Sequence, residues 1–197
     1  MKLETVEKKL HIAYPQACRS IYESGAMRWM CGRPQAQSHF FPNQLLETMC
    51  PEYCRGWSPL LFSDVVLVRE NLMEQVQEHG GQWKEGVQIL PFAWDDDGDI
   101  YFFDAALEDP EAPVFAWMKF SGEIGLTNRS FEHFIFSHLC EPILYADLPA
   151  DHWWVRKQQG WLTPEHQAVL ASGDSEALEE LFSQLDIWEE TDYLIYQ

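Results

Sequence analysis

Two short β-type segments stand on either side of an acidic turn near the middle of the chain. Residues 87–94 and 100–104 are rich in valine, isoleucine and aromatic residues, and Asp97-Gly98 lies between them. Aspartate tolerates left-handed backbone and glycine adopts positive φ at no steric cost, so this turn between apolar segments favours a hairpin. We therefore predict that Val87–Trp94 pairs antiparallel with Ile100–Asp104, followed by a third β-type segment, Pro113–Phe120.

Segments with helical periodicity flank this hairpin on both sides. Apolar residues at spacings of three and four predict a helix over Asp64–Glu78, and Ser130 is a good N-cap for a later helix. Pro15 suits the first turn of a helix, and an earlier helix has three apolar residues on one face: Leu3, Val6 and Leu10. The pattern predicts an α+β fold, with a mostly antiparallel or mixed central sheet flanked by helices.

Proline residues at positions 142 and 149 predict the end of this α+β domain, which would span residues 1–142. Residues 143–197 would then form an acidic helical extension. Within it, Thr163-Pro164 and Asp174 predict the starts of two helices. We expect this helical pair to pack on the domain through one apolar stripe: Leu178, Leu181, Phe182 and Leu185.

Acidic residues outnumber basic residues by 32 to 13, which gives a formal net charge of −19. A nucleic acid would need lysine and arginine to meet its phosphates, and an anionic membrane surface would repel this chain. The first ten residues contain no apolar segment typical of a secretory signal, and no apolar run approaches the roughly 18 residues of a membrane span. We therefore expect a cytoplasmic protein with reduced cysteines, whose charged partners are basic.

The familiar chemical motifs are missing from the chain. The acidic turn departs from a calcium-binding EF-hand, because glycine is fourth from Asp95 and the twelfth position is Ala106. His133 and His138 are five residues apart, which places them on different faces of a helix. The thiols of Cys31, Cys50 and Cys54, with His39 nearby, lack the Cys-x-x-Cys spacing of common zinc sites, and nucleophile-elbow and phosphate-loop motifs are absent. We expect no metal, no cofactor and no catalytic residue.

Several segments of the chain together resemble one protein family. They are Leu90-Pro91-Phe92-Ala93-Trp94, Gly98 to Asp104, Pro113-Val114-Phe115 and Ser130 to Ile135, with Tyr14 to Ala17 and Glu23-Ser24-Gly25 near the N-terminus. Over roughly residues 10–140 the chain resembles the SUKH superfamily, which joins bacterial toxin-immunity proteins with a fungal regulator of cell-wall glucan synthesis. The resemblance implies an α+β fold, a bacterial immunity-type role and action by binding rather than catalysis.

The charge and the aromatic residues indicate where a partner would bind. Nine acidic residues and no basic residue lie between Glu85 and Glu111. Tryptophan anchors interfaces because it buries a large area at a low entropy cost. We predict that a basic protein partner, such as a toxin domain, contacts the hairpin and the start of the extension through eight residues: Trp94, Asp95, Asp96, Asp97, Asp99, Asp104, Trp153 and Trp154.

Three alternatives remain open from the residues alone. The acidic residues could form only a solvated surface. The chain could be a regulatory or scaffold module in cell-wall or envelope assembly, with the extension as its partner surface. It could also be an enzyme with an unrecognised carboxylate site, which a deep pocket with two facing carboxylates would favour.

Overall fold

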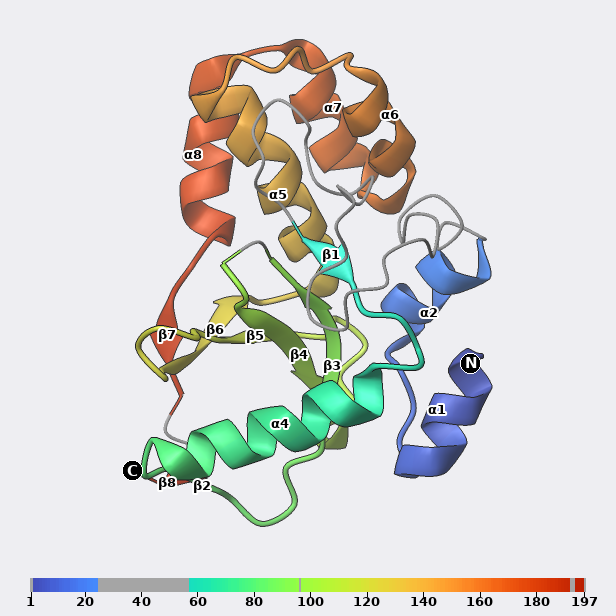
Figure 1. Cartoon of the computed structure of the whole chain (residues 1–197). Coiled ribbons are helices and arrows are strands. Elements are labelled where there is room, and N and C mark those ends of the chain that lie inside the picture. Colours follow the sequence, from blue (N-terminus) through green and yellow to red (C-terminus); the bar gives the residue numbers. More distant parts are fainter. Residues whose placement is uncertain (1, 25–56, 96, 192–193, 197) are drawn as a thin grey trace.

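The computed structural model describes residues 2–24, 57–95, 97–191 and 194–196. Its centre is a six-stranded antiparallel sheet with the strand order β1-β3-β4-β5-β6-β7 (Figure 1). The strands are β1 (Ser58–Pro59), β3 (Ile89–Trp94), β4 (Ile100–Asp104), β5 (Val114–Trp117), β6 (Ile124–Asn128) and β7 (Glu189–Glu190). A second, two-stranded sheet pairs β2 (Gln82–Trp83) with β8 (Ile195–Tyr196).

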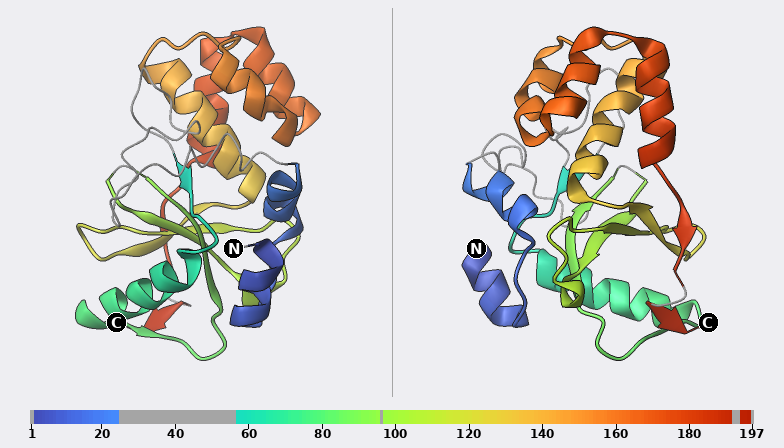
Figure 2. Two further views of the ribbon diagram at one scale, coloured as in Figure 1. Left: turned by 45° about the vertical axis from the view of Figure 1, so that its right-hand side comes forward. Right: turned by 180° about the vertical axis from the view of Figure 1, so that it is seen from behind.

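Helices cover the central sheet from opposite sides. Helix α4 lies along one side, and the later helices gather on the other, as Figures 1 and 2 show. The helices are α1 (Leu3–Leu10), α2 (Gln16–Glu23), α4 (Val65–Glu78), α5 (Phe131–Tyr145), α6 (Trp153–Gln158), α7 (Pro164–Ser172) and α8 (Ser175–Leu185), with short 3₁₀ turns η1 (Ala105–Leu107) and η2 (Gln159–Trp161). The predicted α+β class is therefore confirmed. Among the described residues, no helix is long and apolar enough to cross a membrane.

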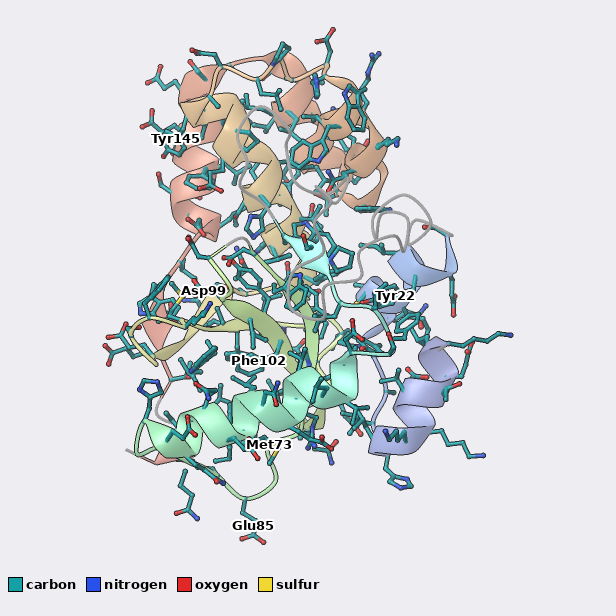
Figure 3. All side chains as sticks on the ribbon, in the orientation of Figure 1. Tyr22, Met73, Glu85, Asp99, Phe102 and Tyr145 are labelled. Atoms are coloured by element: carbon teal, nitrogen blue, oxygen red, sulfur yellow. The ribbon has the colours of Figure 1, made fainter. Side chains whose placement is uncertain are left out.

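The two faces of the sheet are both buried, which explains why the central strands are almost continuously apolar. On the α4 side, Phe102 contacts Trp83 and Phe115 (Figure 3). On the opposite face, Phe92 stacks on Phe103, and both rings pack against aromatic residues at the start of α5: Phe131 for Phe103, and Phe131 and Phe134 for Phe92. The sheet is thus the middle layer of one continuous core.

The predicted hairpin and helix starts are confirmed. Strands β3 and β4 pair antiparallel, with Leu90 opposite Phe103 and Trp94 opposite Ile100. The Ser130 hydroxyl accepts the N–H of His133 at 3.0 Å and so caps α5. The other expected caps form as well: Thr163 Oγ1 accepts the N–H of His166 at the start of α7, and Asp174 Oδ1 accepts two N–H groups at the start of α8.

The C-terminal helices pack on α5 as expected. Leu178 is fully buried, and Leu181, Phe182 and Leu185 are partly buried against the core. The extension also adds strand β7 to the edge of the sheet beside β6. Helix α5 continues across Pro142 to Tyr145, so the chain has no break at the expected boundary. The division into 1–142 and 143–197 stays a prediction.

Strand β6 was not predicted from the sequence. Its residues Ile-Gly-Leu-Thr-Asn include glycine and asparagine, which are depleted in strands. The structure explains the glycine: a Cβ at Gly125 would lie 2.8 Å from the Trp188 ring, which covers this strand. Three of the cysteines considered above, Cys31, Cys50 and Cys54, lie outside the described residues, as does Gly25 of the N-terminal resemblance.

Candidate functional site

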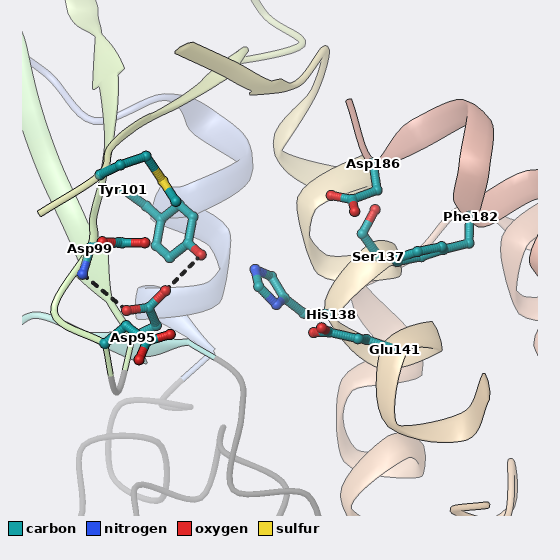
Figure 4. Close-up of a pocket in the computed structure, with 10 residues that line it drawn as sticks. Asp95, Asp99, Tyr101, Ser137, His138, Glu141, Phe182 and Asp186 are labelled. Atoms are coloured by element: carbon teal, nitrogen blue, oxygen red, sulfur yellow. Dashed lines mark hydrogen bonds between the residues drawn. The ribbon is translucent and has the colours of Figure 1, made fainter. Parts of the chain in front are cut away.

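A pocket of about 220 Å³ lies between the β3–β4 turn and the helices α5 and α8 (Figure 4). Five of its lining residues carry carboxylates: Asp95, Asp97, Asp99, Glu141 and Asp186. The rest of its lining comes from Tyr101, Met118, Ser137, His138 and Phe182. None of the described residues that line this pocket is a lysine or an arginine. We call this site the acidic pocket.

Asp95 organises the hairpin wall of the acidic pocket. Its Oδ1 atom accepts the backbone N–H groups of Gly98 and Asp99 at 2.9 and 3.0 Å, and its Oδ2 atom accepts the Tyr101 hydroxyl at 3.1 Å. Gly98 completes the turn with a φ of 88°, which glycine adopts without strain. The Asp95 side chain therefore shapes the turn and also presents negative charge to the pocket.

Asp99 connects this turn to the neighbouring β5–β6 loop. Its side chain accepts the backbone N–H of Lys119 at 2.8 Å, and the residue is only 6% exposed. Phe120, which follows Lys119 in the chain, is by contrast 82% exposed. Two loops that are 20 residues apart are thus joined beside the acidic pocket, and one of them carries an exposed aromatic ring.

The other wall of the acidic pocket comes from α5 and from the end of α8. Ser137, His138 and Glu141 are neighbours on successive turns of α5, and Asp186 directly follows α8. In Figure 4 these side chains face the Asp95–Asp99–Tyr101 group from across the pocket. The His138 ring packs edge-on against Tyr101 and Phe134, with centroid distances of 5.7 and 4.4 Å.

Three carboxylates of the acidic pocket, those of Asp95, Asp99 and Asp186, have raised pKa values. Burial, together with repulsion from Asp99, raises the pKa of Asp95 to about 6. Burial, together with repulsion from Asp97, raises the pKa of Asp99, although the Lys119 backbone N–H and ammonium partly oppose this. Burial and repulsion from Glu141 raise the pKa of Asp186. Burial lowers the pKa of His138 to about 4, so this ring is neutral near pH 7 and does not compensate the negative charge. A bound cation would stabilise the ionised carboxylates, so the pocket is suited to an ammonium or guanidinium group.

The sequence-predicted acidic residues do not all reach this pocket. Asp95, Asp97 and Asp99 line it, whereas Asp96 lies outside the described residues. Asp104 is at the far end of β4, where it is 8% exposed and its Oδ1 atom accepts the N–H groups of Gln88 and Ala106. It borders a separate cavity of about 580 Å³. The Asp104 carboxylate thus holds the end of the strand, and its contact with a partner stays a prediction.

The three tryptophans predicted as anchors also have different environments. Trp154 is 0% exposed, so its proposed role as a surface anchor is wrong: the ring is part of the core. Trp153 is 42% exposed, with the Lys157 ammonium 5.0 Å from its ring centroid. Trp94 is half-buried at the end of β3. Of the three, Trp153 is the most accessible to a partner.

Sequence reasoning missed Glu141 and Asp186 in the acidic pocket and the exposed ring of Phe120. Glu141 stands one turn after Ser137 and His138, so a polar stripe on an otherwise apolar helix was a usable signal. Asp186 had no such signal, because only the packing of α8 on α5 brings it to the hairpin. Phe120 looked like the end of an apolar strand, but β5 ends at Trp117 and leaves this ring in the loop.

The described cysteines have no reactive character. Cys18 and Cys140 are buried, and desolvation raises the pKa of each thiol above its usual value. A thiol rather than a thiolate is a poor nucleophile and a poor metal ligand. These two residues therefore act as small apolar side chains in the core.

Comparison with known proteins identifies the family. A family model for the SMI1 / KNR4 family (SUKH-1) matches residues 2–137. No curated protein matches the chain, and no solved structure matches it either. The matched segment runs from α1 into α5 and includes the hairpin wall of the acidic pocket, whereas Glu141 and Asp186 come after it. The match covers more than half of the sequence, and the chain therefore belongs to the SMI1 / KNR4 family (SUKH-1).

Proposed function

We propose that this protein is a non-catalytic binding module, and that its acidic pocket receives a lysine or arginine side chain of a basic protein partner. The observation that carries the proposal is the convergence on one small cavity of five carboxylates, which come from the hairpin, from α5 and from the residue after α8. The raised pKa values of Asp95, Asp99 and Asp186 reflect desolvation and repulsion from neighbouring carboxylates, which a cationic side chain would relieve. Binding energy is therefore available to a partner that supplies positive charge.

The surroundings of the acidic pocket supply the other part of an interface. Phe120 exposes 82% of its surface on the loop that Asp99 holds in place. Binding hot spots are commonly aromatic side chains surrounded by contacts that exclude water. The interface we propose joins this aromatic ring with the acidic pocket, and the net charge of −19 speeds the approach of a basic partner.

The partner we propose is a toxin domain, with this protein as its immunity-type inhibitor. Membership of the SMI1 / KNR4 family fits a binding module of this kind or a regulatory one. An inhibitor that covers a basic active site needs a surface that is acidic and that a protruding side chain can enter. The acidic pocket has both properties. The cytoplasm is the compartment in which such an inhibitor would protect the cell.

The test begins by capturing the partner from extracts of the native host with the full-length protein and measuring the kinetics of the purified complex. The test variant is Asp97→Asn/Asp186→Asn, which removes two negative charges from the acidic pocket without removing a hydrogen bond that holds the hairpin. We expect a lower association rate and a weaker salt dependence, because long-range attraction between charges is screened by salt.

The matched control is Glu70→Gln/Glu74→Gln, which removes two exposed charges from α4 on the other side of the sheet. This variant has the same net charge as the test variant, so a difference between the two assigns the effect to the acidic pocket. Equal association rates for both variants would contradict the proposed interface.

One observation favours a second candidate function. A deep pocket with facing carboxylates would favour an enzyme, and carboxylates do face each other across the acidic pocket in Figure 4. Its volume of about 220 Å³ is, however, below the roughly 300–1,000 Å³ of small-molecule sites. Asp95 also uses both oxygens in hydrogen bonds. Turnover of any substrate in a broad hydrolase screen, abolished by Asp186→Asn, would support the enzyme instead.

A further inference from the structure

A second cluster of polar side chains lies away from the acidic pocket, where the N-terminal turns of α5 and α7 meet. It consists of Glu132 and His133 on α5 and His166 on α7. One ligand atom from each of these residues lies within 4.8 Å of the other two. No local pattern pointed to this group, because His166 is 33 positions or more from the other two residues and no short motif connects them.

We propose that Glu132, His133 and His166 form a binding site for a divalent transition metal such as Zn²⁺. Two imidazoles and one carboxylate, with water in the fourth position, are a common ligand set for this ion. In a tetrahedral site with bonds of about 2.0–2.2 Å, two ligand atoms lie about 3.3–3.6 Å apart. The three atoms here are close enough for small side-chain rotations to reach that geometry.

The orientation of the ligands is already fixed by the fold. The Nδ1 atom of His166 lies 2.7 and 2.8 Å from the two carboxylate oxygens of Glu132, and one of these oxygens also accepts the N–H of Thr163 at 2.8 Å. The His166 ring packs against Phe136, with a centroid distance of 4.6 Å. Little conformational entropy therefore remains to be lost when a metal binds.

The two imidazoles also lie close enough to share one ion. The centroid of the His133 ring lies 5.7 Å from that of the His166 ring. A metal would take the place of the hydrogen between His166 and Glu132, with the His166 proton then carried on Nε2. The carboxylates of Glu132 and the nearby Glu111 offset the positive ends of the two helices.

Such a site would have a structural consequence. Glu132 and His133 belong to the segment that matches the family model, whereas His166 belongs to the later helices. A shared metal would fasten α7 to α5 and stabilise this junction by mass action, since it binds the folded state alone.

The experiment uses the full-length protein with Cys31→Ser, Cys50→Ser and Cys54→Ser, so that these thiols cannot bind the metal. After chelation and dialysis, the protein is titrated with Zn²⁺ by calorimetry, while NMR follows the histidine rings. We expect one Zn²⁺ per chain, selective shifts of the His133 and His166 rings, and a higher midpoint of thermal unfolding. No saturable binding by the folded protein would mean that the cluster is a hydrogen-bonded helix junction only, and would overturn the proposal.

Variants then assign the ligands. His133→Gln leaves the Glu132–His166 contact intact, so it should fold and yet bind Zn²⁺ at least about tenfold more weakly, as should His166→Gln. The control is His11→Asn, which removes an exposed imidazole at a left-handed position that asparagine tolerates. Equal affinity of His133→Gln and His11→Asn would place the metal elsewhere and overturn the proposal.

Discussion

The β3–β4 hairpin and the C-terminal helices α6–α8 fix their side chains by different forces. In the hairpin, carboxylates hold the backbone: Asp95, Asp99 and Asp104 each accept N–H groups. In the helical region, the burial of apolar side chains holds the backbone in place, and Trp154 and Leu178 lie inside the core. Each region also has a residue of the same type at the surface: Asp97 between Asp95 and Asp99, and Trp153 before Trp154. Adjacent like residues therefore have different roles, and the local packing or hydrogen bonding decides which role each has.

The largest effect should come from the helical region. Trp154→Ala removes a fully buried ring and should lower the free energy of unfolding by about 3–5 kcal/mol. Trp153→Ala removes an exposed ring and its contact with Lys157, so it should cost less than about 1 kcal/mol. Urea unfolding followed by circular dichroism measures both values. Similar losses for the two variants would mean that burial does not separate the pair.

The corresponding change in the hairpin should be smaller. Asp104→Ala leaves the N–H groups of Gln88 and Ala106 without their acceptor, and should cost about 2–3 kcal/mol. Asp104→Asn keeps an acceptor oxygen and should cost no more than about 1 kcal/mol. The same urea experiment compares them. If alanine is tolerated as well as asparagine, the carboxylate of Asp104 does not hold this strand end.

The hairpin should also make stability depend on pH. Burial raises the pKa of Asp95 to about 6 in the folded state, against an ordinary value of 3.8, so between about pH 4 and pH 6 the folded state binds more protons than the unfolded state. The contribution of Asp95 to stability is therefore present below pH 4 and is lost as the pH rises through 6. With allowance for partial exposure, the loss should be about 1–2 kcal/mol.

Asp95→Asn isolates this contribution, because asparagine keeps an acceptor for the turn but does not titrate. Unfolding midpoints at pH 4.5 and 7 should differ less in the variant than in the wild type. A difference of the same size in both proteins would show that Asp95 has an ordinary pKa.

The smallest effect on stability is expected at Phe120, whose ring lies outside the core. Phe120→Ala should change the free energy of unfolding by no more than about 0.5 kcal/mol, because the ring is 82% exposed. Dissociation of the captured partner should nevertheless become faster, since exposed aromatic anchors act mainly on the lifetime of a complex. A marked loss of stability would indicate that this ring packs on the protein itself.

Local signals in the sequence were sufficient for the hairpin and for the helix starts. Asp97-Gly98 between apolar segments and the caps Ser130, Thr163 and Asp174 act over a few residues, so their effect is readable without the rest of the fold. The apolar stripe on α8 was readable for the same reason, because the helical repeat itself defines the buried face. Strand β6 was missed because glycine is unusual in a strand, and the reason for Gly125 is the close approach of the Trp188 ring, which lies 63 residues further along the chain.

The candidate sites depend on contacts that no local pattern contains. The sequence by itself determined that the chain is strongly acidic, that it has an acidic hairpin, and that it resembles SUKH proteins. Only the tertiary structure brought Glu141 and Asp186 to that hairpin and His166 to Glu132 and His133. It also decided which carboxylates are used by the backbone and which remain available. The physical reason is that helix, turn and cap signals act between near neighbours, whereas pockets form where distant segments pack against each other.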